Sequence, residues 1–252
     1  GGYVGHTSAA ARSLSDPAVH AQGPAYFERF ARVPHPSVAG VEKFAEGLKA
    51  AVATAGGADQ VLGIFVELVQ ERTGRVLSDD AQAALMKVRA ETGVPVVFVE
   101  HSTAQYRSGE GAFYSDRLAQ VPDALIWWGG GQVGFVHVSS QYYVPAPLTL
   151  VSTWDGDELS LVRMHHQLRA ARRVDVAAAI KHFDTALTPL RDAGLSVNGH
   201  GLYRVIDAGP RSATLLTGLT EQRIRARRYA NGAIPLVPPL DLDAAGYTRL
   251  MD

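Results

Sequence analysis

Cysteine is absent from this chain of 252 residues, and lysine is scarce. Without cysteine the fold can hold neither a disulfide nor a thiolate metal site. The four lysines are Lys43, Lys49, Lys87 and Lys181. Each falls in a segment that we expect to be an amphipathic helix, so chemistry that needs a lysine nucleophile has few candidate residues.

Long apolar runs and a strong charge imbalance are also missing. The longest apolar stretches, such as residues 61–69, are far shorter than the ~20 residues that cross a bilayer, and no signal peptide is visible. The formal net charge is -1, which argues against a polyanionic partner. We therefore expect a cytoplasmic protein that binds neither membrane nor nucleic acid.

The apolar pattern of the first 150 residues alternates between helix and strand. Residues 38–55 have helical spacing, and residues 78–91 begin with a Ser-Asp-Asp helix start. Residues 61–67, 94–99 and 124–127 form apolar runs typical of parallel strands that are covered on both faces. This order predicts an α/β large domain with a mostly parallel sheet flanked by helices.

The pattern changes after Ser152. We expect a long helix from about residue 156 to residue 182, broken near residues 172–173. The later segments predict short strands and helices: strands at 201–206, 212–216 and 233–237, and helices from 220 and over 242–251. The chain is thus predicted to divide into a large domain, residues 1–170, and a small C-terminal α+β domain, residues 171–252.

Eight short motifs follow one another along the chain. They are Tyr3–Thr7, Val66–Gln70, Phe98–Glu100, Thr103–Gly109, Pro122–Asp123, Val151–Trp154, Gly199–Leu202 and Val237–Leu240. In content and order they resemble motifs of the class-III pyridoxal-phosphate-dependent (PLP-dependent) aminotransferases, especially the lysine ε-aminotransferase and ornithine aminotransferase branch. The resemblance covers essentially the whole chain and implies a PLP-transferase fold of type I.

Three positions depart from what the resemblance implies. The family's lysine, which forms the Schiff base with PLP, corresponds to Gly129. The acid that pairs with the pyridine nitrogen corresponds to Val99, and the arginine that binds the substrate carboxylate corresponds to Val237. Tyr3 corresponds to a point inside the family's large domain, so we expect an N-terminally shortened member. No PLP binding and no aminotransferase activity of this chain alone are expected.

A changed pocket is expected around the glycine run Gly129–Gly131, with Trp127 and Trp128 before it and Gln132 after it. Tyr3 and Val99 complete the expected lining. The bulky indole of Trp128 is predicted to occupy part of the cofactor space, and the small glycines are predicted to make room for the indoles. A phosphate cradle is the alternative, although no lysine, serine or threonine follows at phosphate-loop spacing.

Acid and base groups are predicted at the carboxyl ends of the strands, where open α/β sheets bind ligands. The candidates are His101, Glu100, Glu67 and Tyr106. A pair of His101 and Glu100 can act as general acid and base near neutral pH, whereas a hydrogen-bonded core histidine is the alternative. No metal site is expected, because the adjacent His165 and His166 point in different directions on a helix.

Two functions remain open at this stage. In the first, the protein is a non-catalytic subunit or scaffold, pairing through the family's dimer surface as a homodimer or as a heterodimer with an aminotransferase-like chain. The resemblance implies that Ser152, Thr153 and Trp154 form a loop serving the neighbouring subunit's site. In the second, it is a cofactor-independent enzyme of a specialised, natural-product biosynthetic pathway, which uses a Trp-lined cleft to bind an apolar small molecule.

Overall fold

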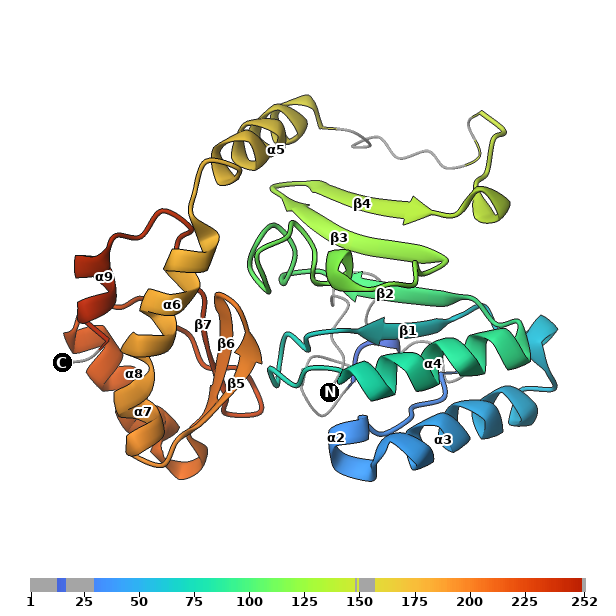
Figure 1. The fold of residues 1–252 in the computed structure, drawn as a ribbon, viewed down its shortest axis with the longest axis horizontal. Coiled ribbons are helices and arrows are strands. Elements are labelled where there is room, and N and C mark those ends of the chain that lie inside the picture. Colours follow the sequence, from blue (N-terminus) through green and yellow to red (C-terminus); the bar gives the residue numbers. More distant parts are fainter. Residues whose placement is uncertain (1–12, 17–29, 148, 150–156, 251–252) are drawn as a thin grey trace.

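The protein has two lobes, each built on its own sheet, in a computed structural model that describes residues 13–16, 30–147, 149 and 157–250 (Figure 1). The sheet of the large lobe has the order β1-β2-β3-β4. Its strands are β1 (Ile64–Glu67), β2 (Val96–Glu100), β3 (Ala124–Gly130) and β4 (Val133–Val138). The first three run parallel and β4 is antiparallel, so the predicted α/β class with a mostly parallel sheet is confirmed.

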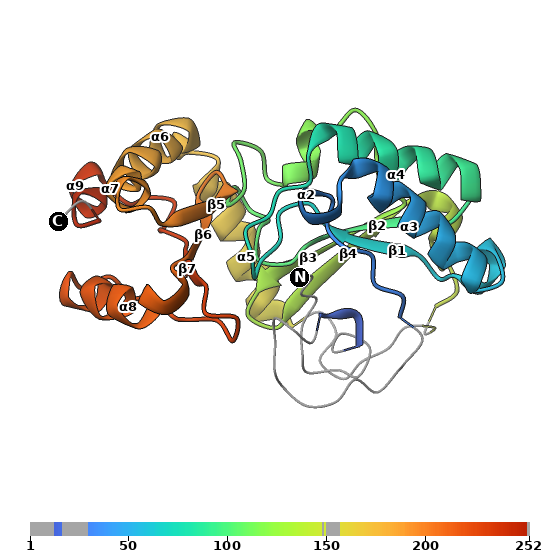
Figure 2. The ribbon, with the colours of Figure 1, turned by 90° about the horizontal axis from the view of Figure 1, so that it is seen from below.

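Helices α3 (Val41–Thr54) and α4 (Asp79–Thr92) lie side by side on one face of this sheet (Figures 1 and 2). The hydroxyl of Ser78 caps α4 by accepting a hydrogen bond from the Ala81 N–H. Short segments complete the lobe: α2 (Pro36–Ala39), η2 (Ala58–Gln60), η3 (Tyr114–Arg117) and η4 (Ser140–Tyr142). The helices bury one face of β1 and β2, where Ile64, Val96 and Phe98 pack against them.

The small lobe has a three-stranded antiparallel sheet in the order β5-β6-β7. Its elements are β5 (Ser196–His200), β6 (Tyr203–Asp207), β7 (Ile234–Leu236), α6 (Val176–Ala186), α7 (Thr188–Asp192), η5 (Gly209–Arg211), α8 (Ser212–Glu221) and α9 (Ala244–Thr248). A core of its own, centred on Phe183, Leu202, Ile206 and Ile234, holds the sheet to the helices. The α+β composition of this lobe agrees with the prediction.

Helix α5 (Glu158–Ala171) lies between the lobes and contacts β3 (Figure 1). It ends at the predicted break near residue 172, where the predicted domain boundary also falls, and the segment expected to continue it forms α6. The strand predicted at 212–216 is wrong, because these residues belong to α8. Leu215, Leu216 and Leu219 have the spacing of one helix face, which a short apolar run does not distinguish from a strand.

The turn between β5 and β6 connects the small lobe to the large lobe through close contacts. Gly201 has a φ of 59°, and a Cβ at this position would lie 2.7 Å from the Gly109 backbone nitrogen. Next to it, His200 Nδ1 lies 2.7 Å from the Ser108 carbonyl oxygen. Only glycine permits this close approach, which fixes the loop after β2 against the small lobe.

No helix among the described residues is long and apolar enough to cross a membrane.

Candidate functional site

The glycine run forms the turn of the hairpin between β3 and β4. Gly130 and Gly131 have φ values of 92° and 61°, in the left-handed region that favours glycine. The Gln132 N–H donates to the hydroxyl of Ser160 on α5 at 3.2 Å, and Gln132 itself is exposed. The conformation of the turn, rather than a bound phosphate, is therefore sufficient to account for these two glycines.

The two tryptophans before the turn occupy opposite faces of β3, because side chains alternate along a strand. Trp127 is 5% exposed; its ring stacks on Phe135 with centroids 4.4 Å apart and meets the edge of Phe113 at 5.3 Å. Trp128 is 43% exposed, and its ring is nearly parallel to the His101 ring at 5.8 Å. Trp127 is thus packed among aromatic rings, whereas Trp128 is open to solvent.

Gly129 lies on the packed face, with Trp127. A Cβ at this position would be 2.7 Å from Cε2 of Phe135 and 3.3 Å from Cγ of Met164 on α5. Any side chain at Gly129 therefore requires the Phe135 ring to move. This is the position that corresponds by resemblance to the Schiff-base lysine.

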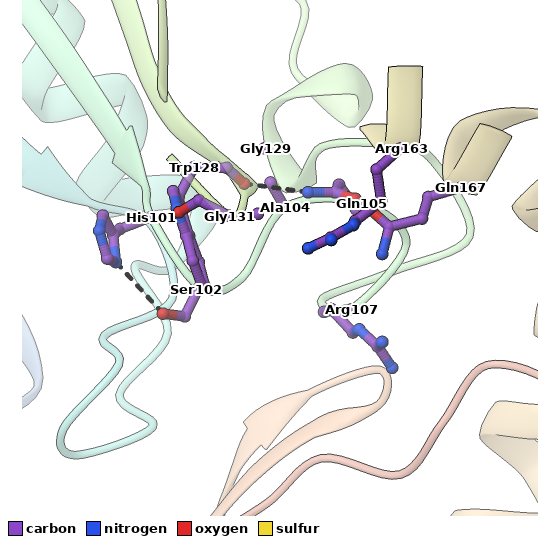
Figure 3. A pocket seen from close by; sticks show the side chains of 11 residues that line it. His101, Ser102, Ala104, Gln105, Arg107, Trp128, Gly129, Gly131, Arg163 and Gln167 are labelled. Atoms are coloured by element: carbon purple, nitrogen blue, oxygen red, sulfur yellow. Dashed lines mark hydrogen bonds between the residues drawn. The ribbon is translucent and has the colours of Figure 1, made fainter. Parts of the chain in front are cut away.

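A cavity of about 350 Å³ lies on the open face, beneath α5 (Figure 3). The loop after β2 contributes His101, Ser102, Ala104, Gln105 and Arg107 to its wall. The end of β3 contributes Trp128 and the three glycines, and α5 contributes Arg163 and Gln167. Of the predicted site residues, this cavity brings together His101, Trp128 and the backbone of Gly129, whose Cβ direction points to the packed face.

Glu100 does not line the cavity but lies on the Trp127 face, since it pairs with Trp127 across the sheet. Its carboxylate is fully buried and accepts the backbone N–H groups of Tyr114 at 2.6 Å and Ser115 at 2.9 Å. Burial raises the pKa of Glu100, and the hydrogen bonds from Ser115 and Tyr114 only partly offset this. The side chain thus anchors η3 beneath the sheet.

The carboxylate in contact with His101 is instead Glu71, which the sequence analysis missed. The Ser102 hydroxyl donates to Glu71 Oε2 at 2.5 Å, and His101 Nδ1 lies 3.4 Å from the same oxygen. Burial opposes ionisation of Glu71, but hydrogen bonds from His101 and Ser102 and the charge of Arg72 outweigh it and lower its pKa. Glu71 directly follows the Val66–Gln70 motif, which was the available signal.

The other predicted residues that the structure describes lie outside the cavity wall. Glu67 Oε1 accepts the Glu71 N–H at 3.1 Å, and Val99 is buried in the middle of the sheet. Tyr106 packs on the core of the small lobe and has a φ of 64°. Tyr3 and the predicted loop Ser152, Thr153 and Trp154 lie outside the described residues.

No lysine lines the described wall of this cavity. Lys43 and Lys49 lie on α3, Lys87 on α4 and Lys181 on α6, as predicted. Lys49 and Lys87 both pair with Glu91. In the described part of the chain, no group of three histidines or acids could hold a metal ion.

Solved structures of transaminases are similar to this chain over most of its length. The (S)-enantioselective omega-transaminase from Thermomicrobium roseum has a TM-score of 0.78 at 18% identity, covering 99% of this chain and 64% of that one. A transaminase from the marine bacterium Virgibacillus has a TM-score of 0.72 at 18% identity, covering 84% of this chain and 55% of that one. An ornithine aminotransferase from Plasmodium yoelii has a TM-score of 0.65 at 19% identity, covering 84% and 58%.

These similarities establish an aminotransferase fold. The chain spans less than two thirds of the length of each of the three transaminases. No protein-family model and no curated protein matches the chain.

Proposed function

We propose that this protein is an aminotransferase-fold protein without Schiff-base chemistry, acting as a non-catalytic subunit that pairs with a second copy or with an aminotransferase-like chain. The observation that carries the proposal is the environment of Gly129. The position that corresponds to the reactive lysine has no side chain, and the space beside it is filled by Phe135 and Met164.

The residues present do not fit PLP bound as a Schiff base. Such a site needs a lysine within reach and an acid beside the pyridine nitrogen. Neither a lysine nor an acidic side chain lines the described cavity wall. Val99, at the position corresponding to the acid, has an apolar side chain that is buried.

Support for pairing comes from β4 and the segment after it. Among the described residues, β4 has no strand on its outer side, so its backbone groups are open to pairing. Large apolar side chains are exposed along the same stretch: Val136, Val138, Tyr142, Tyr143 and Val144. An open strand edge with clustered exposed apolar groups is typical of a protein interface.

The cofactor half of the proposal is tested by titrating the purified protein with PLP, following absorption, and then reducing with borohydride and measuring the intact mass. We expect no Schiff-base absorption band and no added mass. A saturable band with a reducible adduct would show that one of the four lysines reaches the cofactor, and the proposal would be wrong.

The pairing half is tested with Val136→Lys, which places a charge on the exposed side of β4. Val38 on α2 is 63% exposed, as is Val136, so Val38→Lys is a matched control. We expect sedimentation equilibrium to show a weaker dimer for Val136→Lys and an unchanged one for Val38→Lys. A monomeric wild-type chain would contradict pairing with a second copy; co-expression with an aminotransferase-like chain would then test the heterodimer.

A cofactor-independent enzyme is the second candidate, and the contact of His101 with Glu71 favours it. A histidine held by a buried carboxylate at a cavity wall is an arrangement suited to general acid or base catalysis. Once a turnover is found, His101→Ala should lower kcat by about 100-fold or more, and His137→Ala, on the aromatic Trp127 face, should not. Equal rates for both variants would rule out this role.

A further inference from the structure

The cavity beneath α5 is lined by cationic and amide groups. Arg107, Arg163 and His101 contribute nitrogen-bearing side chains, and Gln105 and Gln167 contribute carboxamides. No acidic side chain is part of this wall among the described residues. Such a lining favours a negatively charged molecule beside Arg163, on the α5 side of the cavity, whereas the Glu71 carboxylate offsets positive charge at His101.

Arg163 has its donors available. No hydrogen bond or ion pair joins it to another residue in the described part of the chain. By contrast, Arg107 donates to the Pro238 carbonyl oxygen at 2.5 Å. In Figure 3, Arg163 and Gln167 extend from α5 toward Gln105 over the cavity. The guanidinium of Arg163 is therefore positioned to bind a carboxylate in bidentate geometry.

Trp128 provides a fixed flat surface next to these charges. Its indole Nε1 donates to the Gly131 carbonyl oxygen at 3.2 Å, and its own carbonyl oxygen accepts from Gln105 Nε2 at 2.9 Å. The residue is 43% exposed, and its indole is held by the bond to Gly131 and by the stacked His101 ring. An exposed indole that does not need to reorganise is a good stacking partner for a planar ligand.

The loop that carries Gln105 is backbone-strained. Gln105 and Tyr106 have φ values of 59° and 64°, in the left-handed region that residues with a Cβ seldom adopt. Strain of this kind persists only where the surroundings impose it, and it is concentrated at ligand sites. Here it holds the Gln105 amide against β3 at the cavity wall.

We propose that this cavity binds a small organic anion with a flat apolar group, such as an aromatic carboxylate, held without a covalent bond. The acid group is bound by Arg163 and Gln167, and the ring lies on Trp128. A volume of about 350 Å³ is at the lower end for ligand cavities, which suits a molecule of one or two rings. The absence of a covalent bond is the only respect in which this inference depends on the proposed function.

The test is calorimetric titration of the purified protein with 2-naphthoate, compared with its neutral counterpart 2-naphthamide. We expect saturable binding of 2-naphthoate and binding of the amide weaker by roughly tenfold or more, because one charge-assisted interaction is lost. Arg163→Met should weaken 2-naphthoate by a similar factor. Arg169→Met, which removes the same charge from α5 outside the cavity wall, should leave it unchanged.

Trp128→Ala should weaken both probes, since each carries the same ring. No saturable binding, equal affinities for acid and amide, or equal effects of the two arginine variants would overturn the inference. Because 2-naphthoate has no aldehyde, these results are independent of the borohydride experiment. A PLP adduct with unaltered naphthoate binding would refute the proposed function alone.

Discussion

The two sides of β3 differ more than their sequence suggests. Trp127 and Trp128 are consecutive and identical, yet one is 5% exposed among aromatic rings and the other is 43% exposed at a cavity. The Gly129 position belongs to the packed side. The comparison teaches that the side of β3 that bears Gly129 is closed by packing, whereas on the other side Trp128 lines an open cavity.

The two buried carboxylates, Glu100 and Glu71, also differ between the two sides of β3. Glu100, on the Trp127 side, is bound by backbone N–H groups and has a raised pKa because of its burial. Glu71 is also buried, but its contacts with His101, Ser102 and Arg72 lower its pKa. The packed side thus favours a neutral carboxyl group, and the cavity side an ionised one.

Replacing each tryptophan by alanine should reveal the largest difference in stability between the two sides of β3. Trp127→Ala removes a buried ring that stacks on Phe135, and we expect it to lower the free energy of unfolding by about 3–5 kcal/mol. Urea denaturation monitored by circular dichroism measures this loss. A loss below about 1 kcal/mol would show that the aromatic cluster is not a packed core.

Replacing the carboxylates should give opposite pH dependences. Because its folded-state pKa is lowered, Glu71 stabilises the fold above its ordinary pKa, and this contribution disappears as the pH falls through the lowered value. Glu71→Gln should therefore cost about 2–3 kcal/mol at neutral pH and progressively less in acid.

Glu100 is the matched control for this measurement. Its pKa is raised, so its contribution is fully present in acid and is lost as the pH rises through the raised value. Relative to Glu100→Gln, the wild type should become less stable on going from about pH 4 to about pH 7. Parallel pH profiles of unfolding free energy for the two variants would remove the distinction between the sides.

Gly129→Ala should cost about 1–2 kcal/mol, because the new methyl group meets the Phe135 ring. Phe135→Leu in the same chain should recover part of this cost, which thermal unfolding of the single and double variants measures. Additive effects of the two substitutions would show that Phe135 does not fill the space beside Gly129. Gly129→Lys is expected to remain without a reducible PLP adduct.

Trp128→Ala is expected to have the smallest effect on stability, below about 1 kcal/mol, since its ring is already half exposed. The same urea denaturation serves as the measurement. If its loss equalled that of Trp127→Ala, the cavity face would be as tightly packed as the other.

Much of the large lobe could be predicted because α3, α4 and the strands β1 to β3 have distinct apolar patterns, whereas β4 was not predicted. The strands β1 and β2 are apolar on both sides, and α4 begins with a capping serine. The error at α8 arose where a short apolar run fits both periods. Alternation along β3 places Trp127 and Trp128 on opposite faces, a consequence that follows from the sequence once the strand is assigned.

Fewer features of the candidate site could be predicted from the sequence. Trp127 is covered because Phe135 on β4 stacks on its ring. Phe135 and Met164 on α5 also fill the space beside Gly129. The partner of His101 depends on how the chain turns after β1, which brings Glu71 to Ser102 across 31 positions of sequence. Such contacts follow from tertiary structure and have no local pattern.

The loop from His101 to Gly109 has mechanical consequences because both of its ends are fixed. It begins beside Trp128 at the cavity, and it ends against the Gly201 turn of the small lobe. Arg107 in its middle is bonded to Pro238 in the small lobe and also lines the cavity. A rotation of one lobe against the other would therefore displace Arg107, and with it one wall of the cavity.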